Sequence, residues 1–95
     1  SRRIVVTGMG MITPLGLDVG STWAGILAGK SGIRKIANFD PSALPVQIAG
    51  EVPGFDPEHY VEHKEIKKTD LFILGGIAAS IEAMRDANLE VTEAN

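Results

Sequence analysis

The chain has 95 residues, a net charge of −3 at pH 7 and no cysteine. This length gives at most one small domain, and the charge argues against nucleic acid as the main partner, because such domains usually carry an excess of Lys and Arg. Disulfides, thiolate metal sites and thiol nucleophiles are excluded within the chain, and the absence of any long apolar stretch or signal peptide predicts a soluble protein with no membrane contact.

The first element is predicted to be a strand at residues 4–6. This run, Ile-Val-Val, is short, β-branched and without polar alternation, which is typical of a strand buried on both faces. Gly8 and Gly10 follow it and allow close contacts that side chains would prevent.

A helix is predicted next, over residues 19–28. Asp18 is a suitable N-cap, and Gly29 is suitable for ending the helix. Its apolar stripe consists of Trp23, Ile26 and Leu27.

The middle of the chain reads as turns around one short strand. Residues 46–52 alternate loosely between apolar and polar and end at Pro53-Gly54, which predicts a strand. A short helical turn is predicted to open at Asp56. The acids Asp40, Glu51 and Asp56 are interpreted as turn residues rather than as a catalytic pair.

A long helix is predicted over residues 64–88. Its stripe consists of Ile66, Ile73, Ile77 and Met84. Residues 71–81 carry no charge on any face, so we expect burial on several sides, which the rest of so short a chain is too small to provide.

Two motifs suggest ligands but favour structural interpretations. Gly8-Met9-Gly10 after a strand is typical of dinucleotide binding, yet the third glycine position holds Thr13 and Pro14 follows it. His59, Glu62 and His63 match an inverted zinc-peptidase pattern, but no third ligand follows, so a solvated turn and no metal are expected.

Three lysines form the remaining candidate site. Lys64, Lys67 and Lys68 stand at i, i+3 and i+4, which places them on one face of a helix. Cations at a helix N-terminus oppose the macrodipole, so helix stability alone does not favour them. An ordinary solvated face and a docking patch for an acidic partner both fit this pattern.

Residues 3–16, Arg-Ile-Val-Val-Thr-Gly-Met-Gly-Met-Ile-Thr-Pro-Leu-Gly, closely resemble the start of the β-ketoacyl-acyl carrier protein synthases, of the thiolase superfamily. Further similarity lies at residues 22–23, 27–33, 39–40, 49–50, 64–72 and 83–84. The spacing of Phe39-Asp40 and of the lysines is most similar to the elongating type II bacterial form.

The resemblance implies an α/β protein with the thiolase-like αβαβα layered fold, usually a cytoplasmic homodimer. Residues 1–95 would be an N-terminal fragment, the opening part of its N-terminal half. The parent enzyme would be an acyltransferase that condenses an acyl thioester with malonyl-acyl carrier protein in fatty-acid elongation, by decarboxylative Claisen condensation. The catalytic Cys-His-His set would lie beyond Asn95, so no catalytic residue is expected in this chain.

The resemblance also assigns Lys64, Lys67 and Lys68 to the surface that contacts acyl carrier protein. No cofactor is expected in the chain, because phosphopantetheine is carried by that partner. Two other interpretations stay open: a polyketide ketosynthase or chain-length-factor subunit, and a standalone noncatalytic binding module. The last would have to cover residues 71–81 within this chain.

Overall fold

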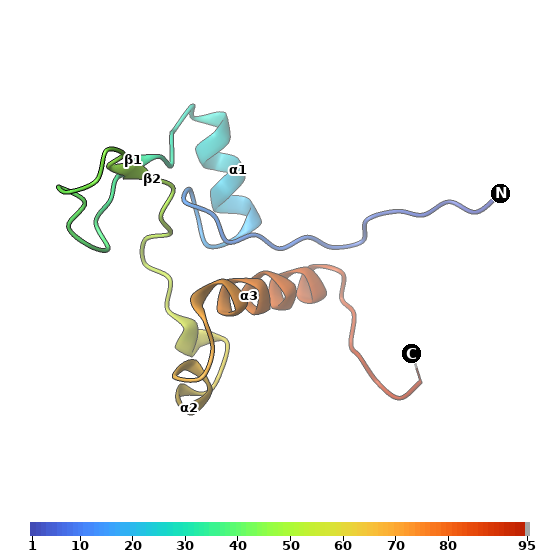
Figure 1. Cartoon of the computed structure of the whole chain (residues 1–95). Coiled ribbons are helices and arrows are strands. Elements are labelled where there is room, and N and C mark those ends of the chain that lie inside the picture. Colours follow the sequence, from blue (N-terminus) through green and yellow to red (C-terminus); the bar gives the residue numbers. More distant parts are fainter. Residues whose placement is uncertain (95) are drawn as a thin grey trace. The chain divides into compact units, whose positions relative to one another are not determined.

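The computed structural model describes residues 1–94, which contain three α-helices, one 3-10 helix and one two-stranded sheet (Figure 1). In chain order they are α1 (Val19–Leu27), β1 (Arg34–Lys35), β2 (Ile48–Ala49), η1 (Pro57–His59), α2 (His63–Ile66) and α3 (Leu71–Asp86). The chain divides into two compact units, one formed by residues 12–55 and the other by residues 1–11 together with 56–94.

The helix predicted over residues 19–28 is confirmed as α1. The Asp18 carboxylate accepts a hydrogen bond from the Ser21 amide at 2.7 Å, which satisfies one of the free amides of the first turn. Gly29 adopts a φ of +72°, and the Lys30 amide reaches back to the Gly25 carbonyl at 3.0 Å. This left-handed glycine after the last turn satisfies the carbonyls that the helix leaves open.

The predicted apolar stripe of α1 lies at the surface. The exposed fractions of its residues are 57% for Trp23, 52% for Ile26 and 69% for Leu27. The buried residues are instead Thr22 and Gly25, because the loop before the helix packs on that side. The hydroxyls of Thr13 and Thr22 form a hydrogen bond of 2.9 Å.

Removing the Asp18 carboxylate should weaken α1 in a pH-dependent way. Hydrogen bonds from the hydroxyl and then the amide of Ser21 lower the pKa of Asp18 below its ordinary value of 3.8. The ionised carboxylate therefore stabilises the folded state above the unfolded pKa, and this contribution disappears as pH falls through the lowered folded pKa. We expect the Ser21 amide hydrogen to exchange faster in Asp18→Ala than in wild type at pH 6. The difference in exchange rate should vanish at pH values below the lowered pKa of Asp18.

A suitable control for this titration is Asp70→Ala. Asp70 is the N-cap of α3 but makes no side-chain capping hydrogen bond, so its loss should leave exchange in the first turn of α3 unchanged across the same pH range. A Ser21 amide that exchanges equally fast in wild type and Asp18→Ala at pH 6 would contradict the prediction.

The strand predicted over residues 46–52 is confirmed, but only Ile48–Ala49 pairs. It runs antiparallel to β1, with Arg34 opposite Ala49 and Lys35 opposite Ile48. Glu51 closes the hairpin loop, since its two carboxylate oxygens accept the Ala37 and Asn38 amides at 2.8 and 3.1 Å.

Asp40 and Asp56 serve as turn residues, as predicted, whereas Glu51 binds amides 13 and 14 positions earlier in the chain. Asp40 accepts the Ser42 amide and Asp56 accepts the Glu58 amide, each at 3.0 Å. The predicted helical turn at Asp56 is present as η1, with Pro57 as its first residue.

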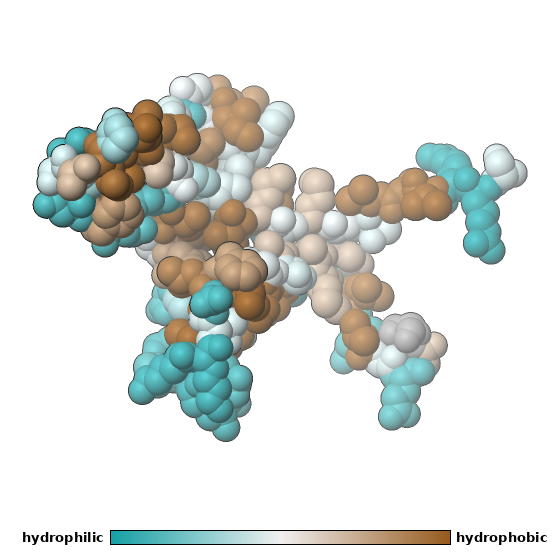
Figure 2. All heavy atoms as spheres, viewed as in Figure 1, coloured by the Kyte–Doolittle hydropathy of each residue, from teal (hydrophilic) through white to brown (hydrophobic). Residues whose placement is uncertain are grey.

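The predicted buried strand at residues 4–6 is wrong for this structure. These residues form no strand, and the exposed fractions are 94% for Ile4, 63% for Val5 and 79% for Val6. Figure 2 shows them as an uncovered hydrophobic arm next to a hydrophilic end. A strand needs a neighbouring backbone to satisfy its amides and carbonyls, and within residues 1–94 none pairs with this segment.

The single long helix predicted over residues 64–88 is also wrong, because the chain breaks it into α2 and α3. Thr69 turns its hydroxyl onto the Glu65 carbonyl at 2.8 Å, and Asp70 is extended, with φ −67° and ψ 151°. Both residue types compete with helical hydrogen bonding, so they favour helix ends over helix interiors. The end of α3 near Asn88 is confirmed, and Asn88 itself has a φ of 54°.

The buried face of α3 is centred on Leu74 and Ala78, which are 2% and 1% exposed. This face lies one position from the predicted stripe, whose Ile73 is 43% exposed. Leu71 and Phe72 are also exposed, so the helix is not covered on all sides. No helix within residues 1–94 is long and apolar enough to cross a membrane.

Candidate functional site

The three lysines lie at the junction of α2 and α3 rather than on a continuous helix. Lys64 is inside α2, Lys67 is its C-cap, and Lys68 follows in the turn, where its amide donates to the Glu65 carbonyl at 3.1 Å. The break at Asp70 therefore keeps Lys67 and Lys68 out of the first turn of α3. A cation beside the C-terminus of a helix is favourable, which removes the cost that a continuous helix would impose.

The charge of this lysine turn, residues 64–68, is only partly neutralised. Lys64 Nζ lies 3.6 Å from Glu62 Oε2, with both side chains 75% exposed. Lys67 and Lys68 are exposed, and their side chains make no ion pair or hydrogen bond with any residue from 1 to 94. Figure 2 shows hydrophilic residues gathered over α2. The turn thus carries two exposed cations that are unpaired within the described part of the chain.

The structure does not assemble the zinc pattern. His59 ends η1 and His63 begins α2, so the two imidazoles do not share a helix. Each histidine has its own carboxylate: His63 Nδ1 lies 2.6 Å from Glu58 Oε1, and His59 Nε2 lies 3.6 Å from Asp56 Oδ2. Among the described residues, no group of three or more histidines and acids is placed to hold a metal.

The Gly8-Met9-Gly10 segment is not arranged as a phosphate cradle. The Met9 amide donates to Asp86 at 3.0 Å, and the Met11 amide donates to Glu82 at 2.8 Å. Carboxylates at these positions repel a pyrophosphate, and the first helix begins only at Val19. These bonds hold the segment against α3, and the absence of a nucleotide site stays a prediction.

Glu82 and Asp86 were not selected from the sequence, although a signal is present in it. They are two carboxylates four residues apart on a helix, and Ala79 and Ala83 have the same spacing beside them. The spacing puts Glu82 and Asp86 on one face of the helix, and Ala79 and Ala83 on one face as well. The small alanine side chains leave room for another segment of backbone to approach the helix.

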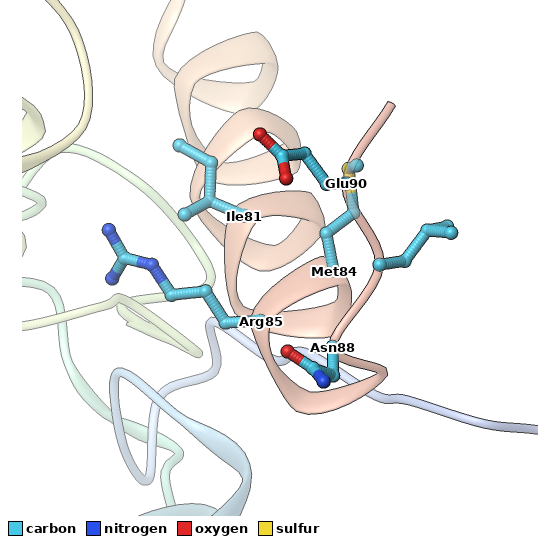
Figure 3. Close-up of a pocket in the computed structure, with 6 residues that line it drawn as sticks. Ile81, Met84, Arg85, Asn88 and Glu90 are labelled. Carbon is cyan, nitrogen blue, oxygen red and sulfur yellow. The ribbon is translucent and has the colours of Figure 1, made fainter. Parts of the chain in front are cut away.

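A shallow pocket of about 590 Å³ lies at the end of α3 (Figure 3). Its lining consists of Ile81, Met84, Arg85, Asn88, Leu89 and Glu90. The labelled side chains come from the last turns of α3 and from the segment just after it. The pocket combines an apolar wall with one guanidinium and one carboxylate, and it contains no nucleophile, so it carries no catalytic set.

Comparison with known proteins gives consistent matches. A family model described as "Beta-ketoacyl synthase, N-terminal domain" matches residues 1–95. Two proteins named 3-oxoacyl-[acyl-carrier-protein] synthase 2, from Vibrio cholerae and Coxiella burnetii, are 52% and 45% identical over 94 residues, or 99% of this chain. The chain spans 23% of the length of each.

The fold comparison agrees with the sequence comparison. A solved structure described as "The ishigamide ketosynthase/chain length factor" superposes with a TM-score of 0.83 and 36% identity, covering 94% of this chain and 22% of that one. The expected thiolase-like α/β layered fold is thereby confirmed. The chain belongs to the β-ketoacyl synthase family and corresponds to part of its N-terminal domain.

Proposed function

We propose that this chain is the opening part of an elongating 3-oxoacyl-[acyl-carrier-protein] synthase and that its lysine turn helps to bind the acyl carrier protein. The observation that carries the docking proposal is the pair of exposed, unpaired cations at Lys67 and Lys68. The family assignment supports the activity, and the names of the relatives give the carrier as the partner. A cytoplasmic homodimer belongs to the same proposal.

The proposed reaction joins two thioesters. A cysteine outside this chain takes the acyl group from the carrier's pantetheine thiol, which leaves as the free thiol. The malonyl thioester then loses carbon dioxide, and the resulting carbanion attacks the acyl carbonyl and expels the cysteine thiolate. A thiolate of lowered pKa suits the first step. This chain would supply scaffold and docking surface, with no resident cofactor.

Two alternative functions were open from the sequence, a polyketide ketosynthase or chain-length factor and a standalone binding module. A polyketide ketosynthase or chain-length factor is supported by the likeness to the ishigamide ketosynthase/chain length factor, but identity to that protein is 36%, against 52% for the Vibrio cholerae synthase. The residue at the nucleophile position of the full-length protein separates the elongating synthase from this alternative. A standalone module is disfavoured, because Leu71 and Phe72 remain 68% and 77% exposed within this chain.

Reversing the charges of Lys67 and Lys68 should weaken carrier binding without harming the chemistry. Each exposed contact contributes up to about 1 kcal/mol, so we expect Lys67→Glu/Lys68→Glu to raise KM for the acyl-carrier substrate by roughly 10-fold, with kcat nearly unchanged. The increase should shrink as salt is added, because exposed charges are screened. Steady-state kinetics of the full-length synthase at two ionic strengths measure this.

The control variant is Lys30→Glu/Lys35→Glu, which makes the same change in net charge at two exposed lysines in residues 12–55. An acyl-pantetheine substrate without carrier protein provides a second control and should be used equally well by both variants. Equal KM values for the carrier substrate in the two double variants would overturn the docking proposal.

A further inference from the structure

We propose that Glu82 and Asp86 form a two-point clamp that holds the backbone of residues 8–11 on α3 in a single register. The Met9 amide donates to Asp86 Oδ2 at 3.0 Å and the Met11 amide donates to Glu82 Oε1 at 2.8 Å. These bonds join residues 77 and 71 positions apart in the sequence. The clamp therefore connects the two stretches of chain that make up this unit, residues 1–11 and 56–94.

The spacing of donors and acceptors matches without distortion. Two residues of extended chain advance about 6.6 Å, and four residues of α-helix advance about 6 Å. Amides at Met9 and Met11 can therefore both reach carboxylates at Asp86 and Glu82 when the two segments run in opposite directions. A carboxylate acceptor also makes a stronger hydrogen bond than a neutral one.

The two glycines that alternate with the donors, Gly8 and Gly10, favour this register. A Cβ at Gly8 would collide with the Ala83 carbonyl oxygen, and a Cβ at Gly10 would collide with the Ala79 carbonyl oxygen. If residues 8–11 slid along α3 by one residue, Met9 or Met11 would take the place of a glycine. Its side chain would then face the backbone of α3 near Ala79 or Ala83, where no Cβ fits. The glycines set the close approach, and the carboxylates set the position along the helix.

The placement of Asp86 supports this role independently. It is the last residue of α3, where a negative charge opposes the helix macrodipole. Helix stability alone would favour a neutral or basic residue there. The bond to the Met9 amide supplies a reason for a carboxylate at this position.

Amide hydrogen exchange in the full-length protein, followed by NMR, tests the clamp one bond at a time. We expect Asp86→Ala to speed exchange of the Met9 amide by about tenfold or more, with less effect at Met11. We expect Glu82→Ala to do the reverse. Asp86→Asn and Glu82→Gln keep an oxygen acceptor and should give intermediate rates.

The control is Glu93→Ala, which removes an exposed carboxylate that lies outside α3 and makes no bond to residues 8–11. It should leave both amides unchanged. Where an alanine variant does not fold, Asp86→Asn or Glu82→Gln replaces it, and the exchange rates of the Met9 and Met11 amides are compared in the same way. Unchanged rates at Met9 and Met11, or equal acceleration of both amides in either single variant, would overturn the one-to-one clamp.

Discussion

Replacing Gly10 with alanine is expected to lower the free energy of unfolding by about 1–3 kcal/mol, as overpacking of a tight contact does. The added Cβ would lie 2.7 Å from the Ala79 carbonyl carbon and 2.9 Å from the Ala83 amide nitrogen. These atoms belong to the backbone of α3, which cannot rotate away as a flexible side chain can. Residues 8–11 would have to lift off the helix, with loss of the Met11 bond to Glu82.

Urea unfolding of the full-length protein measures this loss, with Gly20→Ala as the matched control. At Gly20 the nearest atom to an added Cβ is Asp18 Oδ1, 3.9 Å away, so the same substitution makes only an ordinary van der Waals contact. Glycine costs up to about 1 kcal/mol relative to alanine inside a helix, so the control should be neutral or slightly stabilising. Equal midpoints for the two variants would show that the contact at Gly10 is not tight.

Leu74→Ala is expected to be still more damaging, with a loss of about 2–5 kcal/mol. Leu74 is 2% exposed and is the largest side chain in the buried face of α3. Truncation removes apolar contacts of a side chain that is almost fully buried and leaves a cavity in the packed face of α3. Chemical denaturation again gives the change in the free energy of unfolding.

Leu71→Ala makes the identical substitution one turn earlier on α3, at a side chain that is 68% exposed within this chain. We expect a smaller loss than for Leu74→Ala, because Leu71 has fewer apolar contacts to lose within this chain. A loss below about 1 kcal/mol for Leu74→Ala would contradict the assignment of Leu74 to the core. A loss at Leu71 equal to that at Leu74 would show that residues outside this chain cover Leu71.

The features that the sequence predicts well are those that neighbouring residues decide. Asp18 caps α1 through Ser21, only three positions away, and Gly29 ends it through bonds back into the last turn. Asp40 and Asp56 are equally local, because each accepts the amide two positions further on. Such bonds need no distant partner, so residue type and spacing are enough to predict them.

The predictions that proved wrong concern burial, because burial depends on residues far away in the sequence. The run at residues 4–6 has the composition of an inner strand, but a strand forms only beside another strand. The small side of α3 is matched to Gly8 and Gly10 by contacts across more than 65 positions of the chain. No periodicity within either segment indicates the other.

The break between α2 and α3 could have been predicted. Thr69-Asp70 directly before an apolar run is typical of a helix start, but the lysines upstream continued the helical spacing and hid it. For the candidate site, the sequence selected the three lysines and the resemblance gave them a partner. Their position in a turn, and the lack of ion pairs at Lys67 and Lys68, required the structure.

The interruption at Asp70 separates the surface charges from the packing face along the chain. A single turn of helix carries the surface charges, while the next helix carries the packing face with Leu74 and Ala78. Under the docking proposal, substitutions at Lys67 and Lys68 therefore change the binding surface while leaving Leu74 and Ala78 in place.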